Sequence, residues 1–488
     1  MGLEALRFLE PFWPHLVVAL SIALAAGTSV HAVLYKRDPR SAVAWVGLVW
    51  LSPIVGSLIY VVFGVNRIER RAVSLRRRRR RIEQVEPRLI CTAEELRERL
   101  GPDLEHLVAL SRVGETVYGR PLLEGNAVEP LINGEQAYPA MLAAIDAAAK
   151  TVTLLAYIFE KDEVGERFIE ALGRAGKRGV ETRVLIDAVG GGGTLRATMR
   201  ALRELGVKAA VFQPVLLPWR TRFMNLRNHR KVLVVDGSVG FTGGMNIRAS
   251  NCLEGSARHR EQDVHFRIEG PVVEHLQEAF VDDWAFATGE VLLRKQWFPE
   301  HPRETGTVNA RGVPFDPGER LDTLRHVLVG ALAAARRTVR IVTPYFLPEP
   351  ALIAALNVAA LRGVEVDILI PERPDSRIVH WATEAQLWQV LAAGCRVWRT
   401  KPPFEHTKLM VVDGAWTFLG SANFDPRSLR LNFEFNVECY DRGLGARVEE
   451  IIEAKRRTAW PATLHQVNAR PLPVRLRDGL ARLFSPYL

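Results

Sequence analysis

The stretch that decides the fold is HTKLMVVDG at residues 406–414, because a near copy, HRKVLVVDG, stands at residues 229–237. In both copies one residue separates His from Lys, and four apolar residues lead from Lys to Asp-Gly. Side chains alternate along a strand, so each His shares a face with its Lys. A single His-x-Lys pair is weak evidence of function. Two pairs with the same spacing indicate an element that the chain builds twice.

The segments before the two copies are repeated as well. RGVETRVLI at residues 178–186 returns as RGVEVDILI at residues 362–370, which is 184 residues later. Apolar runs between turn residues predict strands, and longer stretches that end at glycine predict helices. We predict strands at 151–159, 180–187 and 208–215 with a helix at 164–178, and, in the second half, strands at 338–346, 364–370 and 396–400 with a helix at 351–362.

Small and polar residues follow each element. A Gly-Gly step leads to Asn246, and a Gly-Ser step that contains Ser421 leads to Asn423. Lysine and asparagine donors can hold and neutralise a phosphodiester without a metal. One neutral imidazole can attack phosphorus, while a protonated one gives its proton to the leaving alkoxide. We predict catalytic roles for His229, Lys231, His406 and Lys408 and phosphate binding by Asn246, Ser421 and Asn423, with no metal and no other cofactor.

Four carboxylates accompany these elements. Asp236 and Asp413 complete the repeated pattern and are included in the catalytic set. Their position on the opposite strand face, before a glycine, favours a structural role at a hairpin turn. Asp263 and Glu434 follow the two elements at similar distances and are the candidates to orient the imidazoles, which must differ in protonation state. The alternative for this pair is an ordinary solvated strand carboxylate.

The N-terminal region is apolar and then strongly basic. Pro14–Tyr35 and Ser41–Val65 hold no Asp, Glu, Lys or Arg, and about 20 apolar residues suffice for a helix to span a bilayer. Residues 66–90 contain ten arginines and three glutamates, which favours a cytoplasmic location for that segment. We expect a membrane hairpin at 1–65 (helices about 14–35 and 41–65) in the inner cell membrane, a basic linker at 66–124, and cytoplasmic repeats at 125–310 and 311–488. Pro53 and two nearby glycines leave a re-entrant or tilted second segment open.

The composition excludes several classes of protein. The chain has 488 residues, of which 48% are hydrophobic, and this is too apolar for a disordered chain. Most of the net charge of +10 lies in residues 66–90, which argues against a nucleic-acid partner. The four cysteines form no Cys-x-x-Cys pair, so a zinc ribbon is not expected. The sequence says nothing about oligomeric state.

At its two His-x-Lys elements the chain resembles the phospholipase D superfamily, whose signature is H-x-K-x4-D in duplicate. Residues 406–437 and the apolar N-terminal region are similar to those of bacterial cardiolipin synthases. The resemblance implies an α/β fold of two tandem repeats, each with a mixed sheet flanked by helices. It also implies a membrane enzyme that transfers a phosphatidyl group between two phosphatidylglycerol molecules, with His229 as nucleophile and His406 as acid and then base. The Arg-Glu-Gln before Asp263 departs from the family pattern.

Three alternatives remain open at this point. A phospholipase D that uses water as acceptor shares every motif, a nucleic-acid phosphodiesterase belongs to the same superfamily, and a lipid-binding scaffold needs no catalysis. At the C-terminus, residues 474–484 fit an amphipathic helix that lies on a membrane surface or one that packs on the domain.

Overall fold

The computed structural model describes residues 13–36, 39–64, 89–213, 226–255, 257–299, 301–317 and 322–485. The described chain forms two units, an N-terminal one up to residue 64 and a second one that begins at residue 89. The arginine run at residues 76–81 lies outside the described residues.

The N-terminal unit contains one helix that is long and apolar enough to cross a membrane, α2 (Trp13–Tyr35), and it is the only such helix in the part of the chain that is described. The second apolar run is not a single helix, contrary to our expectation for 41–65. It forms α3 (Pro39–Leu51), α4 (Pro53–Ile59) and a π-helical turn (Tyr60–Gly64). Proline lacks a backbone N–H and its ring crowds the preceding turn, which favours a break before Pro53 and its place as the first residue of α4.

Polar contacts join these apolar helices. His31 Nδ1 lies 2.8 Å from the Tyr60 hydroxyl, and the hydroxyls of Thr28 and Ser57 are 3.1 Å apart. Such contacts between apolar helices stabilise their association where water cannot compete. The N-terminal unit is therefore a small helical assembly with its own contacts.

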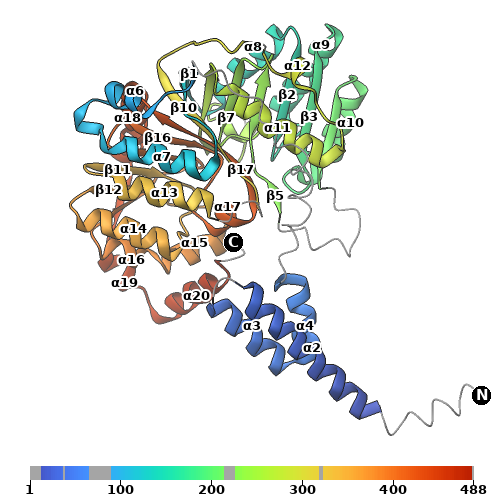
Figure 1. Ribbon diagram of the computed structural model, residues 1–488, viewed down its shortest axis with the longest axis vertical. Coiled ribbons are helices and arrows are strands. Elements are labelled where there is room, and N and C mark those ends of the chain that lie inside the picture. Colours follow the sequence, from blue (N-terminus) through green and yellow to red (C-terminus); the bar gives the residue numbers. More distant parts are fainter. Residues whose placement is uncertain are drawn as a thin grey trace, which may run out of the picture. The chain divides into compact units, whose positions relative to one another are not determined.

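The second unit is built on a sheet whose strand order shows the duplication (Figure 1). Its centre is an antiparallel pair, β1 (Leu123–Ile132) and β10 (Val308–Phe315). From β1 outward the strands are β9 (Val264–Glu269), β7 (Val239–Gly243), β6 (Val232–Val235), β2 (Thr151–Ala156), β3 (Glu181–Asp187) and β4 (Lys208–Phe212). From β10 they are β17 (Asn432–Tyr440), β16 (Trp416–Gly420), β15 (Leu409–Val412), β11 (Thr338–Val342), β12 (Glu365–Pro371), β13 (Arg396–Thr400) and β18 (Trp460–Ala462).

The strands and helices predicted from the repeated phrases are present, although β2, β4 and β11 end before the predicted residues 159, 215 and 346. The helices at 164–178 and 351–362 correspond to α9 (Glu163–Lys177) and α14 (Pro350–Leu361). Strand β2 ends three residues before the predicted Phe159, because the chain leaves the sheet to bond with another loop. Ile247 N donates to Ile158 O at 3.0 Å, and this contact brings the loop after β2 to the segment that carries Asn246.

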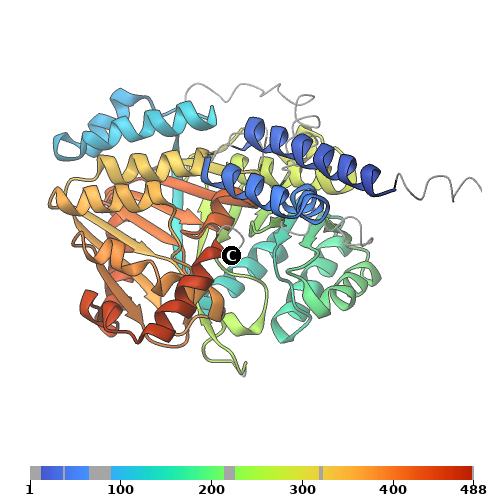
Figure 2. The ribbon, with the colours of Figure 1, turned by 90° about the horizontal axis from the view of Figure 1, so that it is seen from below.

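Helices cover the sheet of each repeat, and the two repeats lie side by side (Figure 2). One core contains residues from both repeats together with α11 (Val273–Thr288) and α18 (Arg442–Thr458). Further helices are α8 (Asn133–Ala147), α10 (Leu195–Glu204), α12 (Arg294–Trp297), α13 (Thr323–Ala334), α15 (Arg377–Glu384), α16 (Leu387–Leu391), α17 (Pro426–Arg430), α19 (Leu464–Asn468) and α20 (Leu472–Leu483).

The stretch expected as a linker at 66–124 is structured where it is described. It holds α6 (Ala93–Leu100) and α7 (His106–Tyr118), whose buried leucines join the core of the second repeat. Arginine and glutamate lie on the outer faces of both helices, so the charge of the segment suggested a linker and not a packed pair of helices. The expected repeat boundary at 310 and 311 falls inside β10, because the second repeat begins with the counterpart of β1.

Candidate active site

Each candidate histidine follows a short strand that pairs in parallel with the other repeat. The strand before His229, β5 (Arg227–Asn228), pairs with β17 of the second repeat. The strand before His406, β14 (Phe404–Glu405), pairs with β8 (Glu261–Gln262) of the first repeat. His229 N donates to Phe433 O at 2.9 Å, and His406 N donates to Gln262 O at 2.8 Å. The backbone therefore fixes each histidine to the opposite repeat.

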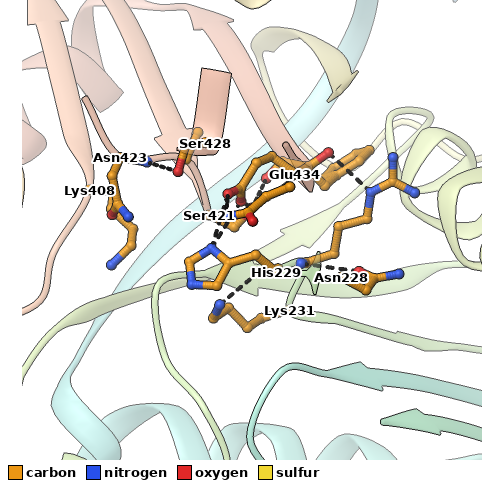
Figure 3. Close-up of polar contacts among 12 residues, drawn as sticks. Asn228, His229, Lys231, Lys408, Ser421, Asn423, Ser428 and Glu434 are labelled. Carbon is orange, nitrogen blue, oxygen red and sulfur yellow. Dashed lines mark hydrogen bonds and ion pairs between the residues drawn. The ribbon is translucent and has the colours of Figure 1, made fainter. Parts of the chain in front are cut away.

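The imidazole–carboxylate pairs cross between the repeats in the same way. His229 Nδ1 lies 3.1 Å from both carboxylate oxygens of Glu434 (Figure 3), and His406 Nδ1 lies 2.8 Å from Asp263 Oδ2. All four side chains are buried. A carboxylate that accepts from Nδ1 fixes the tautomer and directs the lone pair of Nε2 to the far side of the ring. Each imidazole ring is thus oriented by a carboxylate that the other repeat supplies.

The two lysines come from the same elements and reach the same site. Lys231 Nζ donates to His229 O at 2.7 Å, and Lys408 Nζ donates to His406 O at 2.5 Å. Figure 3 shows Lys231 next to the His229 ring and Lys408 farther from the ring, on the side of the second repeat. The charge of Lys408 acts on His229, and the charge of Lys231 acts on His406. The His-x-Lys residues lie between strands, at 229–231 and 406–408, and not within β6 and β15 as predicted.

Burial controls the protonation of these groups. It lowers the pKa of His229 to about 4 and that of His406 well below its usual value. Burial also lowers the pKa of Lys231 and Lys408. Burial alone would raise the pKa of Glu434, but its interactions with His229, Lys231 and the Ser421 hydroxyl lower it overall. Without a bound anion, burial therefore disfavours protonation of the two histidines and the two lysines. The negative charge of a bound phosphodiester would favour their protonation.

The predicted phosphate ligands differ in their surroundings. Asn246 Oδ1 accepts from Ile158 N at 3.2 Å, and the backbone N–H of Asn423 donates to Ser428 Oγ at 3.1 Å. Both asparagine side chains are buried beside the histidine elements. Ser421 differs from the prediction, because its hydroxyl donates to Glu434 Oε2 at 2.5 Å and accepts from Phe435 N at 3.0 Å. We therefore assign Ser421 to the support of Glu434.

The first repeat has glycine where the second has Ser421, and the contacts explain why. A Cβ on Gly244 would lie 2.5 Å from both carboxylate oxygens of Asp263. The second repeat combines serine with the longer glutamate, while the first combines glycine with the shorter aspartate. The two histidines consequently have different supports, which is one way for one fold to give two identical residues different protonation states.

Asp236 and Asp413 lie at the other end of their strands, and neither is bonded to His229 or His406; Asp413 instead contacts His106 Nε2 at 2.6 Å. The Asp236 carboxylate accepts from the backbone N–H groups of residues 149, 150 and 151 at 2.7–2.9 Å. Asp413 accepts from residues 336, 337 and 338 at 2.8–2.9 Å. Both have positive φ angles, 51° and 52°, as the turn before Gly requires. These contacts favour the structural role that their position before a glycine predicted, in which they fix the start of β2 and β11.

One aromatic neighbour was missed by sequence reasoning. The ring of Tyr157 contacts His229 edge-on with centroids 5.0 Å apart, and Lys231 Nζ lies 5.2 Å from the same ring. Tyr345 follows the equivalent strand of the second repeat, and its hydroxyl donates to Asp375 at 2.8 Å. The signal was present, since each of the predicted strands at 151–159 and 338–346 carries a tyrosine near its end.

Comparison with known proteins agrees with this geometry. The family model described as "Cardiolipin synthase, PLD-like domain" matches residues 141–284 and 328–456. The chain belongs to this family of phospholipase D-like proteins. A second model, "Phospholipase_D-nuclease N-terminal", matches residues 23–64.

Similar proteins extend over nearly the whole chain. A cardiolipin synthase of Geobacillus kaustophilus (strain HTA426) is 32% identical over 98% of this chain and 95% of its own length. A cardiolipin synthase A of Pseudomonas aeruginosa (strain UCBPP-PA14) is 34% identical over 94% of this chain and 93% of its own. The crystal structure of a phosphatidylserine synthase from Haemophilus influenzae Rd KW20 shares the fold, with a TM-score of 0.61 and 17% identity over 78% of this chain and all of that one.

The geometry of Asp236 and Asp413 predicts a loss of stability without a loss of chemistry. Each Asn variant keeps the left-handed backbone but turns an amide donor toward backbone N–H groups, which costs about 1–3 kcal/mol. We expect a lower melting temperature and a kcat of the folded enzyme within about twofold of wild type. A His229→Ala variant should show the reverse pattern. An Asp236→Asn enzyme with an unchanged melting temperature and no turnover would contradict this assignment.

The pKa shifts predict that anion binding is coupled to proton uptake. The pKa values of His406, Lys231 and Lys408 are lowered when no anion is bound, so a phosphodiester raises them and the site gains protons near neutral pH. A soluble phosphodiester has no pKa of its own in that range. Calorimetric titration in two buffers of different ionisation enthalpy should show net proton uptake. Proton release on binding would contradict the prediction, and a Lys231→Met/Lys408→Met variant should show less uptake.

Proposed function

We propose that this chain is a cardiolipin synthase that converts two phosphatidylglycerol molecules into cardiolipin and glycerol at one site between the repeats. The observation that carries the proposal is the exchange of partners across the repeats, His229 with Glu434 and His406 with Asp263. Two oriented imidazoles and two buried ammonium groups suit a double displacement at phosphorus. Similarity to proteins named cardiolipin synthase over nearly their full length supports transfer to a lipid alcohol.

The first displacement begins with the binding of one phosphatidylglycerol. Lys231 and Lys408 bind the phosphate oxygens, and Nε2 of neutral His229 attacks phosphorus while Nδ1–H remains bonded to Glu434. The bond from phosphorus to the glycerol oxygen breaks, and His406 gives its proton to that oxygen. Glycerol leaves, and the phosphatidyl group stays on His229. Family resemblance supports the choice of His229 over His406 as nucleophile.

The second displacement reverses these roles. The free glycerol hydroxyl of a second phosphatidylglycerol gives its proton to His406, and the oxygen attacks phosphorus. The bond between phosphorus and His229 Nε2 breaks, which releases cardiolipin and restores both histidines. Within the described residues, no cluster of three His, Cys, Asp or Glu side chains suits a metal ion. In this scheme Lys231 and Lys408 supply the positive charge.

The chain is a membrane-associated enzyme, and we propose a specific topology for it. The family match at residues 23–64 and the length of α2 support insertion of the N-terminal unit. The polar contacts of Thr28 and His31 with α4 and the turn after it support a second apolar segment that enters the membrane beside α2. The arginines of residues 66–90 support a cytoplasmic catalytic unit.

A cysteine placed at exposed Arg457 should react with an impermeant reagent only after the inner membrane is opened.

Analysis of lipid products tests the function directly. Purified protein incubated with phosphatidylglycerol should form cardiolipin and glycerol in equal amounts. Phosphatidic acid as the main product would instead identify a hydrolase that uses water as acceptor.

The matched control is Glu434→Gln, which keeps the shape of the side chain but lacks the negative charge that stabilises His229 when it becomes a cation. We expect this variant to lose about 10²–10⁴-fold in rate, in the range of acid–base contributions.

A further inference from the structure

The C-terminal helix α20 presents an apolar face to the outside of the second unit. Its exposed apolar residues are Leu472 (66% exposed), Leu476 (59%), Leu480 (61%), Leu483 (73%) and Phe484 (60%). With 3.6 residues per turn these positions fall on one side of the helix, and we name them the outer stripe. The sequence left open whether this segment packs on the domain or lies on a membrane surface, and the structure shows one helix with a packed face and an exposed apolar face.

The opposite face of α20 is firmly packed, so the exposure of the outer stripe does not come from a loose helix. Asp478 is 1% exposed and pairs with Arg470 and Arg477. Ala481 packs in a small cluster with Leu347 and Ala382. The Arg477 guanidinium also lies 4.5 Å from the ring centroid of Trp381 in α15. These contacts hold the outer stripe in a fixed orientation beside α15 (Figure 1).

Charge next to the outer stripe selects an anionic partner. Arg475 and Arg482 are exposed and lie on the same flank of the helix, seven residues apart in sequence. The only acidic residue of α20 is Asp478, which is buried and already paired. A helix with leucines on one face and arginines at its border matches the interfacial layer of a bilayer that contains anionic lipid.

The outer stripe is also connected to the active site through packed residues. Leu347 packs against α20 through Ala481, and its backbone N–H donates to Phe424 O at 2.8 Å, next to Asn423. Tyr345, two residues earlier, lies with its ring 6.3 Å from that of Phe404. Phe404 in turn lies 5.8 Å from the His406 ring. Helix α20 and His406 therefore belong to one packed region of the second repeat.

We propose that the outer stripe of α20 inserts into the interfacial layer of an anionic bilayer and holds the His406 side of the active site at the lipid surface. The part of this inference that concerns lipid delivery rests on the proposed function. The contact is additional to the N-terminal helices, which anchor the chain. It differs from a plain anchor because it controls how lipids in a bilayer reach the site.

A charge-insertion variant of the full-length enzyme tests the proposal. In Leu476→Glu/Leu480→Glu two exposed leucines become anions, which an anionic surface repels. We expect at least about a tenfold loss of turnover on phosphatidylglycerol vesicles and less than about a twofold loss on monomeric short-chain phosphatidylglycerol. The matched control is Val358→Glu/Leu361→Glu on α14, whose side chains are 53% and 74% exposed. This control should keep both activities.

A second measurement needs no turnover and so separates the inference from the proposed function. In a Cys252→Ser background, a fluorophore on Leu480→Cys should be quenched by spin-labelled phospholipid in reconstituted vesicles, while one on Leu361→Cys should not. An unquenched probe at residue 480 would overturn the proposal. Cross-linking of that cysteine to residues 13–64 would also overturn it, because the N-terminal helices would then cover the outer stripe. Equal losses on vesicles and on monomeric lipid would overturn the role in delivery. Quenching without cardiolipin formation would leave the surface contact intact and reject the synthase.

Discussion

The structure depends on one exchange of partners, in which each repeat supplies the carboxylate that orients the other repeat's histidine. The pairs His229–Glu434 and His406–Asp263 are buried, and parallel backbone pairing next to each histidine fixes their geometry. Neither repeat alone supplies both members of the His229–Glu434 pair or of the His406–Asp263 pair. The duplication therefore did not produce two active sites, because each half-site is completed only by docking against the other half.

This exchange also offsets part of the cost of burying the charged groups of the site. Burial of two lysines and two histidines in one region is costly unless anions are near. Glu434 and Asp263 offset part of this charge, and the phosphate of the substrate supplies the rest. The lowered pKa values of both histidines follow from the same burial, so the resting enzyme keeps a neutral nucleophile. Binding of the diester then favours protonation of the residue that must serve as acid.

Local sequence patterns predicted much of the fold and site, and long-range pairing explains what they missed. Spacing and apolar periodicity predicted β2, β3, β11, β12 and the helices between them. They also identified both histidines, both lysines and the two orienting carboxylates. The assignment of carboxylate to histidine was beyond local reasoning, because the partners are 205 and 143 residues apart. Ser421 was predicted as a phosphate ligand from its neighbours in sequence. Its bond to Glu434 forms only because β16 and β17 pair in the folded sheet, which the local sequence does not show.

A structure of the enzyme with bound vanadate tests the central claim most directly. We predict one vanadium atom bonded to His229 Nε2, with His406 Nε2, Lys231 Nζ and Lys408 Nζ within hydrogen-bond distance of its oxygens. Two separate vanadate ions, one on each histidine in its own cleft, would contradict a single site shared by the two repeats.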